Sequence, residues 1–252
     1  MTDAGLAAFV DDLEAEQLAL QDLLAGIDAD DWFRPTPAWQ WDVRDTTAHL
    51  ADTDEIALDT MIGGARALGF LAASLASSED VTYTGVLRGR RLPGVGVLAW
   101  WVEASARERD ALRALEPSAR VPWGLGMGVR AFVTARLMET WAHGLDLHAA
   151  LGSEPVDTPR LAHVAWIATR AIPYAYSVAG LEPPGAPLYV ELTLPDGNTW
   201  TSGPPDAADR ITGPAGQYCR VFVQRLDPSA ATDVTAVGDH AVMTLAVARA
   251  YL

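Results

Sequence analysis

The chain has 252 residues, half of them hydrophobic, which is enough for one large domain or for two modest domains that each bury a core. Its formal net charge is −15, from 33 acidic and 18 basic residues. All 18 basic residues are arginines. A chain with this much negative charge lacks the basic surface that binds phosphates. We therefore expect no nucleic-acid partner and no anionic membrane partner. The composition also excludes an intrinsically disordered protein.

The sequence carries few signs of an oxidising compartment or of a membrane. Cys219 is the single cysteine, so an intrachain disulfide is excluded, which fits a reducing environment. The acidic N-terminal stretch lacks the basic start and apolar core of a signal peptide. The longest apolar run, residues 95–102, is too short to span a bilayer. We therefore expect a cytoplasmic protein.

Apolar residues recur every three to four positions along the first 152 residues, a pattern that predicts α-helices. Asp42 is a good N-cap for the second helix, and Asp45 is placed to complete a capping box with it. Gly152 is a typical C-cap residue for the fourth long helix. Long helices are predicted over residues 4–26, 42–61, 95–115 and 130–151, a weaker helix over 65–77, and a loop over 78–94. Four long helices with short connections predict a four-helix bundle.

The second half of the chain has a mixed pattern. Pro173 should interrupt a helix predicted over residues 159–179. Two alternating stretches around the turn Pro195–Asn198 then predict a β-hairpin. Further elements are predicted as a helix over 214–226, a strand over 233–237 and a helix over 240–251. The predicted fold class is α+β, with a helical domain over residues 1–152 and a smaller α+β domain over 153–252.

A polar stripe runs along the fourth predicted helix. Glu139, His143 and Asp146 follow one another in steps of four and three, so they share one helix face. On its own, a Glu–His pair of this kind is most often a surface ion pair worth ~0.3–0.5 kcal/mol. His49 lies on the second predicted helix, and antiparallel packing would bring it to this stripe. Two imidazoles and a carboxylate can then bind zinc or another divalent ion and leave one position open.

Two sequence segments resemble a known family. They are W-x-V-R-D-x-x-A-H-L, from Trp41 to Leu50, and M-E-T-W-A-H-G-x-D, from Met138 to Asp146. Both resemble segments of the DinB-like superfamily, and more closely of its mycothiol-dependent maleylpyruvate isomerase branch. The resemblance implies a metal-binding four-helix bundle followed by a smaller α+β domain similar to sterol-carrier proteins. It also implies that His49, Glu139 and His143 bind a divalent metal, usually zinc.

The same resemblance suggests one catalytic residue in the second domain. In the isomerase branch a helix there ends in Gly-Arg, and that arginine assists the reaction. This sequence has Gln224-Arg225 in the corresponding place, so Arg225 is the expected equivalent, with Arg220 one turn away as the alternative. A surface arginine at a helix C-terminus is the ordinary reading of either residue.

The implied activity is a metal-dependent, thiol-assisted isomerase or S-transferase. A low-molecular-weight thiol, mycothiol in the resembled branch, would be activated by the metal and attack a small electrophilic substrate. A metal-dependent hydrolase would use the same three ligands. A non-catalytic protein that binds metal, or a small-molecule-binding protein of this kind, would have a fourth protein ligand at the metal, with Asp146 or Asp45 best placed in the sequence. A protein without metal would need His49 to lie far from the fourth helix.

Several weaker candidates have an ordinary structural interpretation. Cys219 is expected to be a buried small residue rather than a nucleophile. Asp146 is a candidate outer hydrogen-bond partner of a ligand histidine. The remaining candidates are expected to be structural or solvated; they are His163, His240, Trp39, Trp41, Trp123, Trp141, Arg88, Arg90 and Arg91. As alternatives, the tryptophans near the two motifs could line a pocket, and the arginines could attract an anionic substrate.

Overall fold

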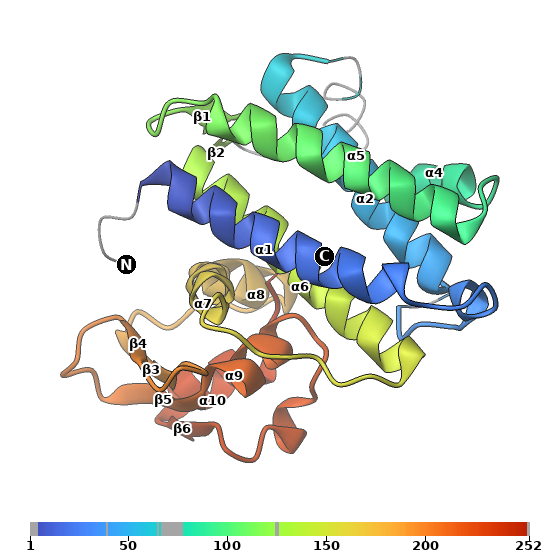
Figure 1. Cartoon of the computed structure of the whole chain (residues 1–252). Helices are drawn as coiled ribbons and strands as arrows, with labels where there is room; N and C mark the ends of the chain where they lie inside the picture. The colour runs from blue at the N-terminus through green and yellow to red at the C-terminus, as the bar shows by residue number, and fades with distance from the viewer. Residues whose placement is uncertain (1–4, 39, 65, 67–77, 124–125, 251–252) are drawn as a thin grey trace. The chain divides into compact units, whose positions relative to one another are not determined.

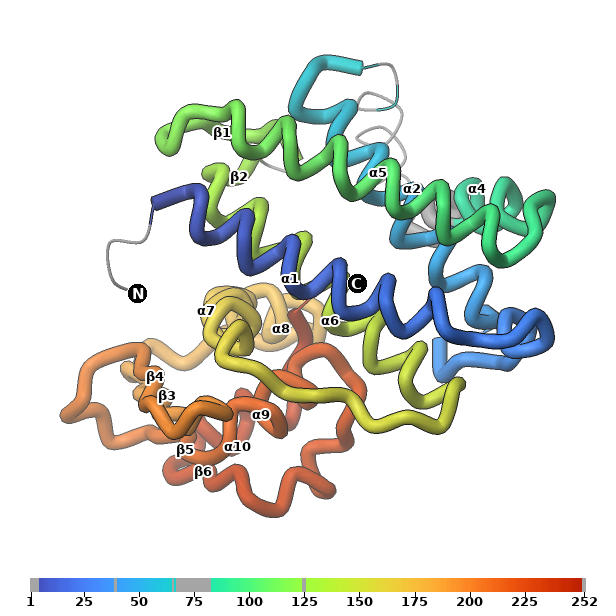
Figure 2. Tube along the Cα trace, viewed as in Figure 1, coloured from blue at the N-terminus to red at the C-terminus, as the bar shows by residue number. Residues whose placement is uncertain are grey.

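The computed structural model describes residues 5–38, 40–64, 66, 78–123 and 126–250. The chain divides into two compact units, Met1–Pro155 and Val156–Leu252; Figures 1 and 2 show mainly helices, with the short strands β1 and β2, in the first, and helices with strands in the second. This arrangement confirms the predicted α+β fold class, in which a helical part precedes a smaller mixed part. The domain boundary at residue 152 stays a prediction.

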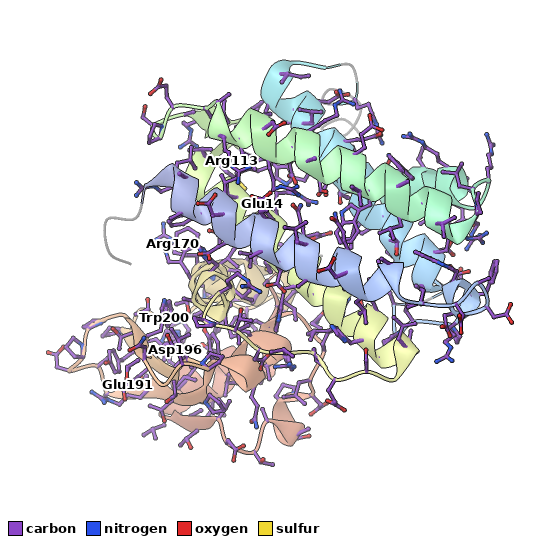
Figure 3. All side chains as sticks on the ribbon, in the orientation of Figure 1. Glu14, Arg113, Arg170, Glu191, Asp196 and Trp200 are labelled. Atoms are coloured by element: carbon purple, nitrogen blue, oxygen red, sulfur yellow. The ribbon has the colours of Figure 1, made fainter. Side chains whose placement is uncertain are left out.

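Within the described residues of the first unit, four long helices form the bundle. They are α1 (Leu6–Ala25), α2 (Val43–Ile62), α5 (Gly94–Arg113) and α6 (Val129–Leu151). Helices α2 and α1 each pack against both α5 and α6, which closes the ring of four. Leucine, valine and tryptophan side chains fill its core. At the rim, Arg113 of α5 reaches Glu14 of α1, with 2.5 Å between Nη2 and Oε2 (Figure 3).

The ends of the two helices that carry the motifs follow largely from the sequence. Asp42 caps α2, and its carboxylate accepts a 2.7 Å hydrogen bond from the backbone N–H of Asp45. Helix α6 ends at Gly152, whose φ of 67° is left-handed, as predicted. The predicted capping box is wrong, because the Asp45 carboxylate forms an ion pair with Arg90 instead, with 2.6 Å between Oδ2 and Nη2.

The predicted loop over residues 78–94 is also wrong, because Ser78–Gly89 forms helix α4, which packs on α2. Two glycines, Gly85 and Gly89, lie within this helix. A Cβ atom at Gly85 would lie 2.4 Å from Cβ of Asp52, and one at Gly89 would lie 2.3 Å from Cβ of Ala48. The glycines therefore permit close helix packing rather than a turn.

Arg88, Arg90 and Arg91 are exposed, as expected of solvated residues, and two of them also pair with acids of α2. Arg88 donates to Glu55 at 2.6 Å and its guanidinium lies 3.9 Å from the centre of a Trp100 ring. Arg90 is held by Asp45. Both arginines therefore fasten the end of α4 to α2 and α5, through ion pairs and a cation–π contact.

Two shorter features complete the first unit. A 3₁₀ turn, η1 (Asp31–Phe33), precedes α2, and the connection from α5 to α6 contains β1 (Arg120–Val121) paired antiparallel with β2 (Met127–Gly128), which the sequence did not predict. The helix predicted over 65–77 lies outside the described residues, apart from Arg66. Across the part of the chain that is described, we find no helix with the length and apolar character needed to cross a bilayer.

The second unit begins with α7 (Leu161–Arg170) and α8 (Ile172–Val178), and Pro173 in the first turn of α8 explains the predicted interruption. Its described strands form a sheet in the order β4–β3–β5–β6. The predicted hairpin is confirmed as β3 (Leu188–Thr193) and β4 (Thr199–Ser202). The remaining elements are β5 (Asp209–Pro214), α9 (Ala215–Phe222), η2 (Pro228–Ala230), β6 (Thr235–Val237) and α10 (Asp239–Ala246).

Strand β5 was missed, although it lies inside the sheet between β3, to which it is parallel, and β6. Its residues Asp209–Pro214 have only one fully buried side chain, that of Ile211, and their polar character resembles a loop. Helix α9 is also shorter than the predicted 214–226, because the backbone turns left-handed at Gln224, where φ is 59°.

Candidate metal centre

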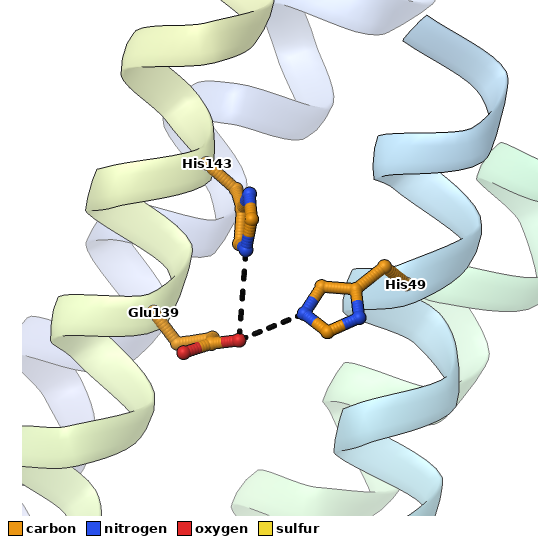
Figure 4. A group of neighbouring side chains, drawn as sticks. All are labelled: His49, Glu139 and His143. Atoms are coloured by element: carbon orange, nitrogen blue, oxygen red, sulfur yellow. Dashed lines mark hydrogen bonds and ion pairs between the residues drawn. The ribbon is translucent and has the colours of Figure 1, made fainter. Parts of the chain in front are cut away.

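Three side chains from two helices meet inside the first unit. His49 comes from α2, and Glu139 and His143 come from α6 (Figure 4). The Nε2 atom of His49 lies 2.8 Å from Oε1 of Glu139, and Nε2 of His143 lies 3.6 Å from the same oxygen. One ligand atom from each residue fits within 4.8 Å of the others. The sequence-predicted metal ligands therefore lie together.

The helices that carry these residues run antiparallel at this point. Asp54 comes five positions after His49 in α2, and its carboxylate binds Arg136. Arg136 comes three positions before Glu139 in α6. The contacts therefore step in opposite directions along the two helices, which confirms the predicted antiparallel packing.

Asp146 supports the cluster from behind. Its Oδ2 lies 3.1 Å from Nδ1 of His143, and its side chain is buried. A carboxylate at this place holds the proton on Nδ1 and leaves the lone pair of Nε2 directed at the cluster. The outer hydrogen-bonding position expected for Asp146 is thus the one that it occupies.

The three groups perturb one another's protonation. Burial lowers the pKa of His49. Burial also opposes the charge on His143, but hydrogen bonds to Asp146 and Glu139 raise its pKa overall. Burial acts to raise the pKa of Glu139, yet the hydrogen bonds of the two histidines hold it well below its usual range. The cluster at neutral pH therefore contains an ionised carboxylate beside one histidine that is readily neutral.

The cluster is not closed by a fourth protein ligand among the described residues. The group that could hold an ion contains His49, Glu139 and His143, and neither Asp146 nor Asp45 belongs to it. Asp146 faces the far nitrogen of His143, and Asp45 is paired with Arg90. The Glu139 side chain keeps 19% of its surface exposed, so the cluster is accessible from that side.

The tryptophans near the motifs have different surroundings. The ring of Trp41 lies against the rings of both His49 and His143. Trp123 instead contacts Phe132, and Trp141 is buried. Trp39 lies outside the described residues.

Sequence reasoning missed a buried charged network one turn below the cluster. Arg136 contacts Asp54 of α2 and Glu108 of α5, and all three side chains are buried. Glu108 belongs to the charged run Arg107–Arg113, which reads as a solvated helix face. The one available signal was helical spacing, because Glu108 lies on the face that includes the buried Trp101, Ala104 and Ser105.

The arginine candidates belong to the second unit. Arg220 makes two hydrogen bonds to Asp157, of 2.7 and 2.9 Å. Arg225 donates from Nη1 to the carbonyl of Val223, and its backbone N–H closes the end of α9 on the carbonyl of Arg220. Gln224 between them is left-handed, a conformation that glycine adopts readily. The role of Arg225 stays a prediction.

The other sequence candidates are buried in the second unit. Cys219 is fully buried in α9, and burial raises the pKa of its thiol far above the ordinary value, which removes the thiolate that a nucleophile needs. His163 and His240 are buried too, and among the described residues neither belongs to a group that could hold a metal.

Comparison with known proteins agrees with this architecture. Proteins from two strains of Mycobacterium tuberculosis, both named as uncharacterized, are 37% identical over 252 residues, which is 100% of this chain and 97% of theirs. Crystal structures of the mycothiol-dependent maleylpyruvate isomerase and of a mutant of that enzyme match 94% of this chain and 95% of theirs. Their TM-scores are 0.61 and 0.60 at 18% and 16% identity, which shows a shared fold.

The family assignment comes from the helical half of the chain. The profile of the mycothiol maleylpyruvate isomerase N-terminal domain matches residues 5–148, which include every residue of the candidate metal centre. The two motifs that resemble the DinB-like superfamily lie within the same match. The chain therefore belongs to the mycothiol maleylpyruvate isomerase N-terminal domain family.

Proposed function

We propose that the protein is a divalent-metal-dependent enzyme that uses a low-molecular-weight thiol to isomerise a small electrophilic substrate. The single observation that carries this proposal is the meeting of His49, Glu139 and His143 in one partly accessible cluster. The family relationship supports the thiol-dependent isomerase class. Mycothiol is the proposed co-substrate.

The donor set fits zinc. Zinc is bound by imidazole nitrogen and carboxylate oxygen at about 2.0–2.2 Å, so the ligand atoms of a tetrahedral site lie about 3.3 Å apart. The distances of 2.8 and 3.6 Å from Oε1 of Glu139 to the two imidazole nitrogens bracket that value. Three protein ligands are typical of catalytic zinc sites, which keep one position open.

Each residue has a defined task in this proposal. A divalent metal at the cluster would lower the pKa of a bound thiol and so supply a nucleophile at neutral pH. His49, Glu139 and His143 hold the ion, and Asp146 keeps the His143 ring in the tautomer that presents Nε2. Arg225 is the proposed partner of a substrate carboxylate or of developing negative charge.

The proposed isomerisation needs no oxidant. The thiolate sulfur forms a bond to one alkene carbon, and the alkene electron pair moves onto the adjoining carbonyl. Rotation about the resulting single bond and loss of the thiolate restore the double bond in the other configuration. If the enolate adduct instead takes a proton from solvent on carbon, the thioether is retained and the enzyme is an S-transferase.

The test is product analysis with zinc-loaded protein and maleylpyruvate, the substrate named for the related enzyme, with and without mycothiol. We expect cis–trans isomerisation that requires both the thiol and the metal, and that stops on addition of a chelator. Proton NMR of the reaction mixture follows both isomers. A stable thioether product would indicate an S-transferase, and cleavage of the substrate by water without thiol would indicate the metal-dependent hydrolase.

The pH dependence of zinc binding gives a separate prediction. Hydrogen bonds to Asp146 and Glu139 raise the pKa of His143, so zinc must displace a proton from its ring below that pKa. The apparent affinity should therefore rise by roughly tenfold per pH unit up to the raised pKa and level off above it. Competition with a chromophoric chelator measures it.

Asp146→Asn is the matched variant for this pH profile. An amide cannot stabilise the protonated ring as a carboxylate does, so the rise should move to lower pH. An unchanged pH profile in this variant would contradict the assignment of the proton to His143.

A further inference from the structure

We propose that Trp41 is a positioning residue of the metal centre, which holds the imidazole of His49 by ring contact in place of a hydrogen-bonded partner. The inference rests on the metal site proposed above. It assigns a functional role to a second side chain of the first motif, Trp41, besides that of His49.

Three aromatic rings pack together at the cluster. The ring centres of Trp41 and His49 are 4.9 Å apart with an interplanar angle of 40°, and those of Trp41 and His143 are 6.0 Å apart with an angle of 35°. The two imidazoles meet edge to face at 4.7 Å. A single indole therefore contacts both candidate ligand histidines, within the 4.5–7 Å range of favourable aromatic pairs.

The two histidines are supported differently. His143 has a carboxylate on Nδ1, supplied by Asp146. The Nδ1 atom of His49 is buried and has no hydrogen-bond partner among the described residues. A metal-binding histidine is normally oriented by a partner on its other nitrogen. For His49, the surface of Trp41 can restrict rotation of the ring, besides the contacts with the other two candidate ligands, Glu139 and His143.

The loop before α2 is built to hold Trp41 in this place. The carbonyl of Trp41 accepts hydrogen bonds from the backbone N–H and the hydroxyl of Thr36, at 2.9 and 3.0 Å. The same hydroxyl lies 3.3 Å from that of Thr46 in α2, which ties the loop to the helix.

The residue before Trp41 carries backbone strain. Gln40 is exposed and has a left-handed φ of 64°, a conformation that costs a non-glycine residue energy. Such strain persists where surrounding contacts fix it, and it turns the chain so that Trp41 faces the histidines.

The experiment compares Trp41→Ala and Trp41→Phe with the wild type by zinc competition titration and by the visible absorption of bound Co²⁺. Loss of an outer partner of a ligand histidine weakens metal binding by about 10–100-fold. We expect a loss of that size for Trp41→Ala, with a changed Co²⁺ spectrum. Trp41→Phe, which keeps an aromatic face, should recover most of the affinity.

Trp166→Ala is the matched control, because Trp166 lies in α7 of the other unit and its ring faces Arg170. Urea unfolding of the metal-free proteins separates ring positioning from folding, since a merely structural role would lower stability without changing the affinity of the folded protein. If Trp41→Ala does not fold, Trp41→Leu, which fills the space without an aromatic ring, is compared instead.

The outcomes separate this inference from the proposed function. Wild-type zinc affinity and an unchanged Co²⁺ spectrum in the folded alanine or leucine variant would overturn the role of Trp41 and leave the metal site standing. A wild type that binds neither Zn²⁺ nor Co²⁺ would overturn both.

Discussion

His143→Ala is expected to abolish stoichiometric metal binding and thiol-dependent activity. The wild type should hold about one divalent ion per chain, because its cluster offers the three protein ligands typical of a catalytic zinc site. Removal of a ligand should cost more than the 10–100-fold lost with an outer partner. His49→Ala should behave in the same way, although it lies on a different helix. Elemental analysis of tag-free protein and zinc titration measure the effect.

His148→Ala is the matched control for this experiment. His148 is on the same helix, five positions after His143, but its Nδ1 lies 2.8 Å from Oγ of Ser153 and it is not part of the cluster. It should retain metal and activity, while circular dichroism shows that all three variants fold. If the wild type holds no metal, or if it binds zinc no better than both ligand variants, the cluster is only an ion pair inside a bundle and not a metal site.

The candidate centre could be predicted from the sequence because its geometry is mostly local. Glu139, His143 and Asp146 are fixed relative to one another by helix periodicity, and the caps Asp42 and Gly152 fix where the two helices begin and end. The one non-local step was the packing of α2 against α6, which follows from the arrangement of helices in a four-helix bundle. The resemblance to a known family supplied the same three ligands independently.

The errors came from residues whose effect depends on distant neighbours. Gly85 and Gly89 look like loop residues until the surface of α2 lies against them. Strand β5 is nearly devoid of buried apolar side chains, and its place inside the sheet follows from its pairing with β3 and β6. Trp41 precedes its helix, so helical periodicity did not indicate which way its ring would face.

The interior of the bundle gives the second large prediction. Arg136 lies among buried acids: its Nη2 is 2.5 Å from Oδ1 of Asp54, and its Nε is 3.1 Å from Oε1 of Glu108. Gln17 donates to both carboxyl groups at 3.3 Å, and Trp101 donates to Asp54 at 2.9 Å. One arginine thus faces two carboxyl groups in a site without water-exposed surface.

Burial raises the pKa of Asp54, and burial together with the charge of Asp54 raises that of Glu108 well above its usual range. We infer that Glu108 keeps its proton at neutral pH and that Asp54 is the ionised partner of Arg136. A folded-state pKa above the unfolded one favours folding most below the unfolded value, and this contribution is lost as the pH rises towards the folded value. The protonated Glu108 should therefore be replaceable by a neutral side chain.

Arg136→Met and Glu108→Gln should consequently differ sharply. Removing the arginine leaves a buried carboxylate without its cation, which typically costs about 3–5 kcal/mol. Glutamine can donate from its amide to Asp54 as the protonated acid does, so Glu108→Gln should change the free energy of unfolding at pH 7 by less than about 1 kcal/mol. It should also remove part of the loss of stability on raising the pH. Urea unfolding of the metal-free proteins at several pH values measures both effects.

The contrast between the two variants decides the charge state of the network. Equal losses in both would mean that Glu108 is ionised and that Arg136 balances two charges. A stable Arg136→Met variant would mean that both acids are neutral in the folded protein. The expected result is a large loss of stability for Arg136→Met and a small change for Glu108→Gln. It requires that Glu108 holds a proton and that Asp54 is ionised. It would also show that a buried positive charge lies one helical turn from Glu139, where the proposed metal ion binds.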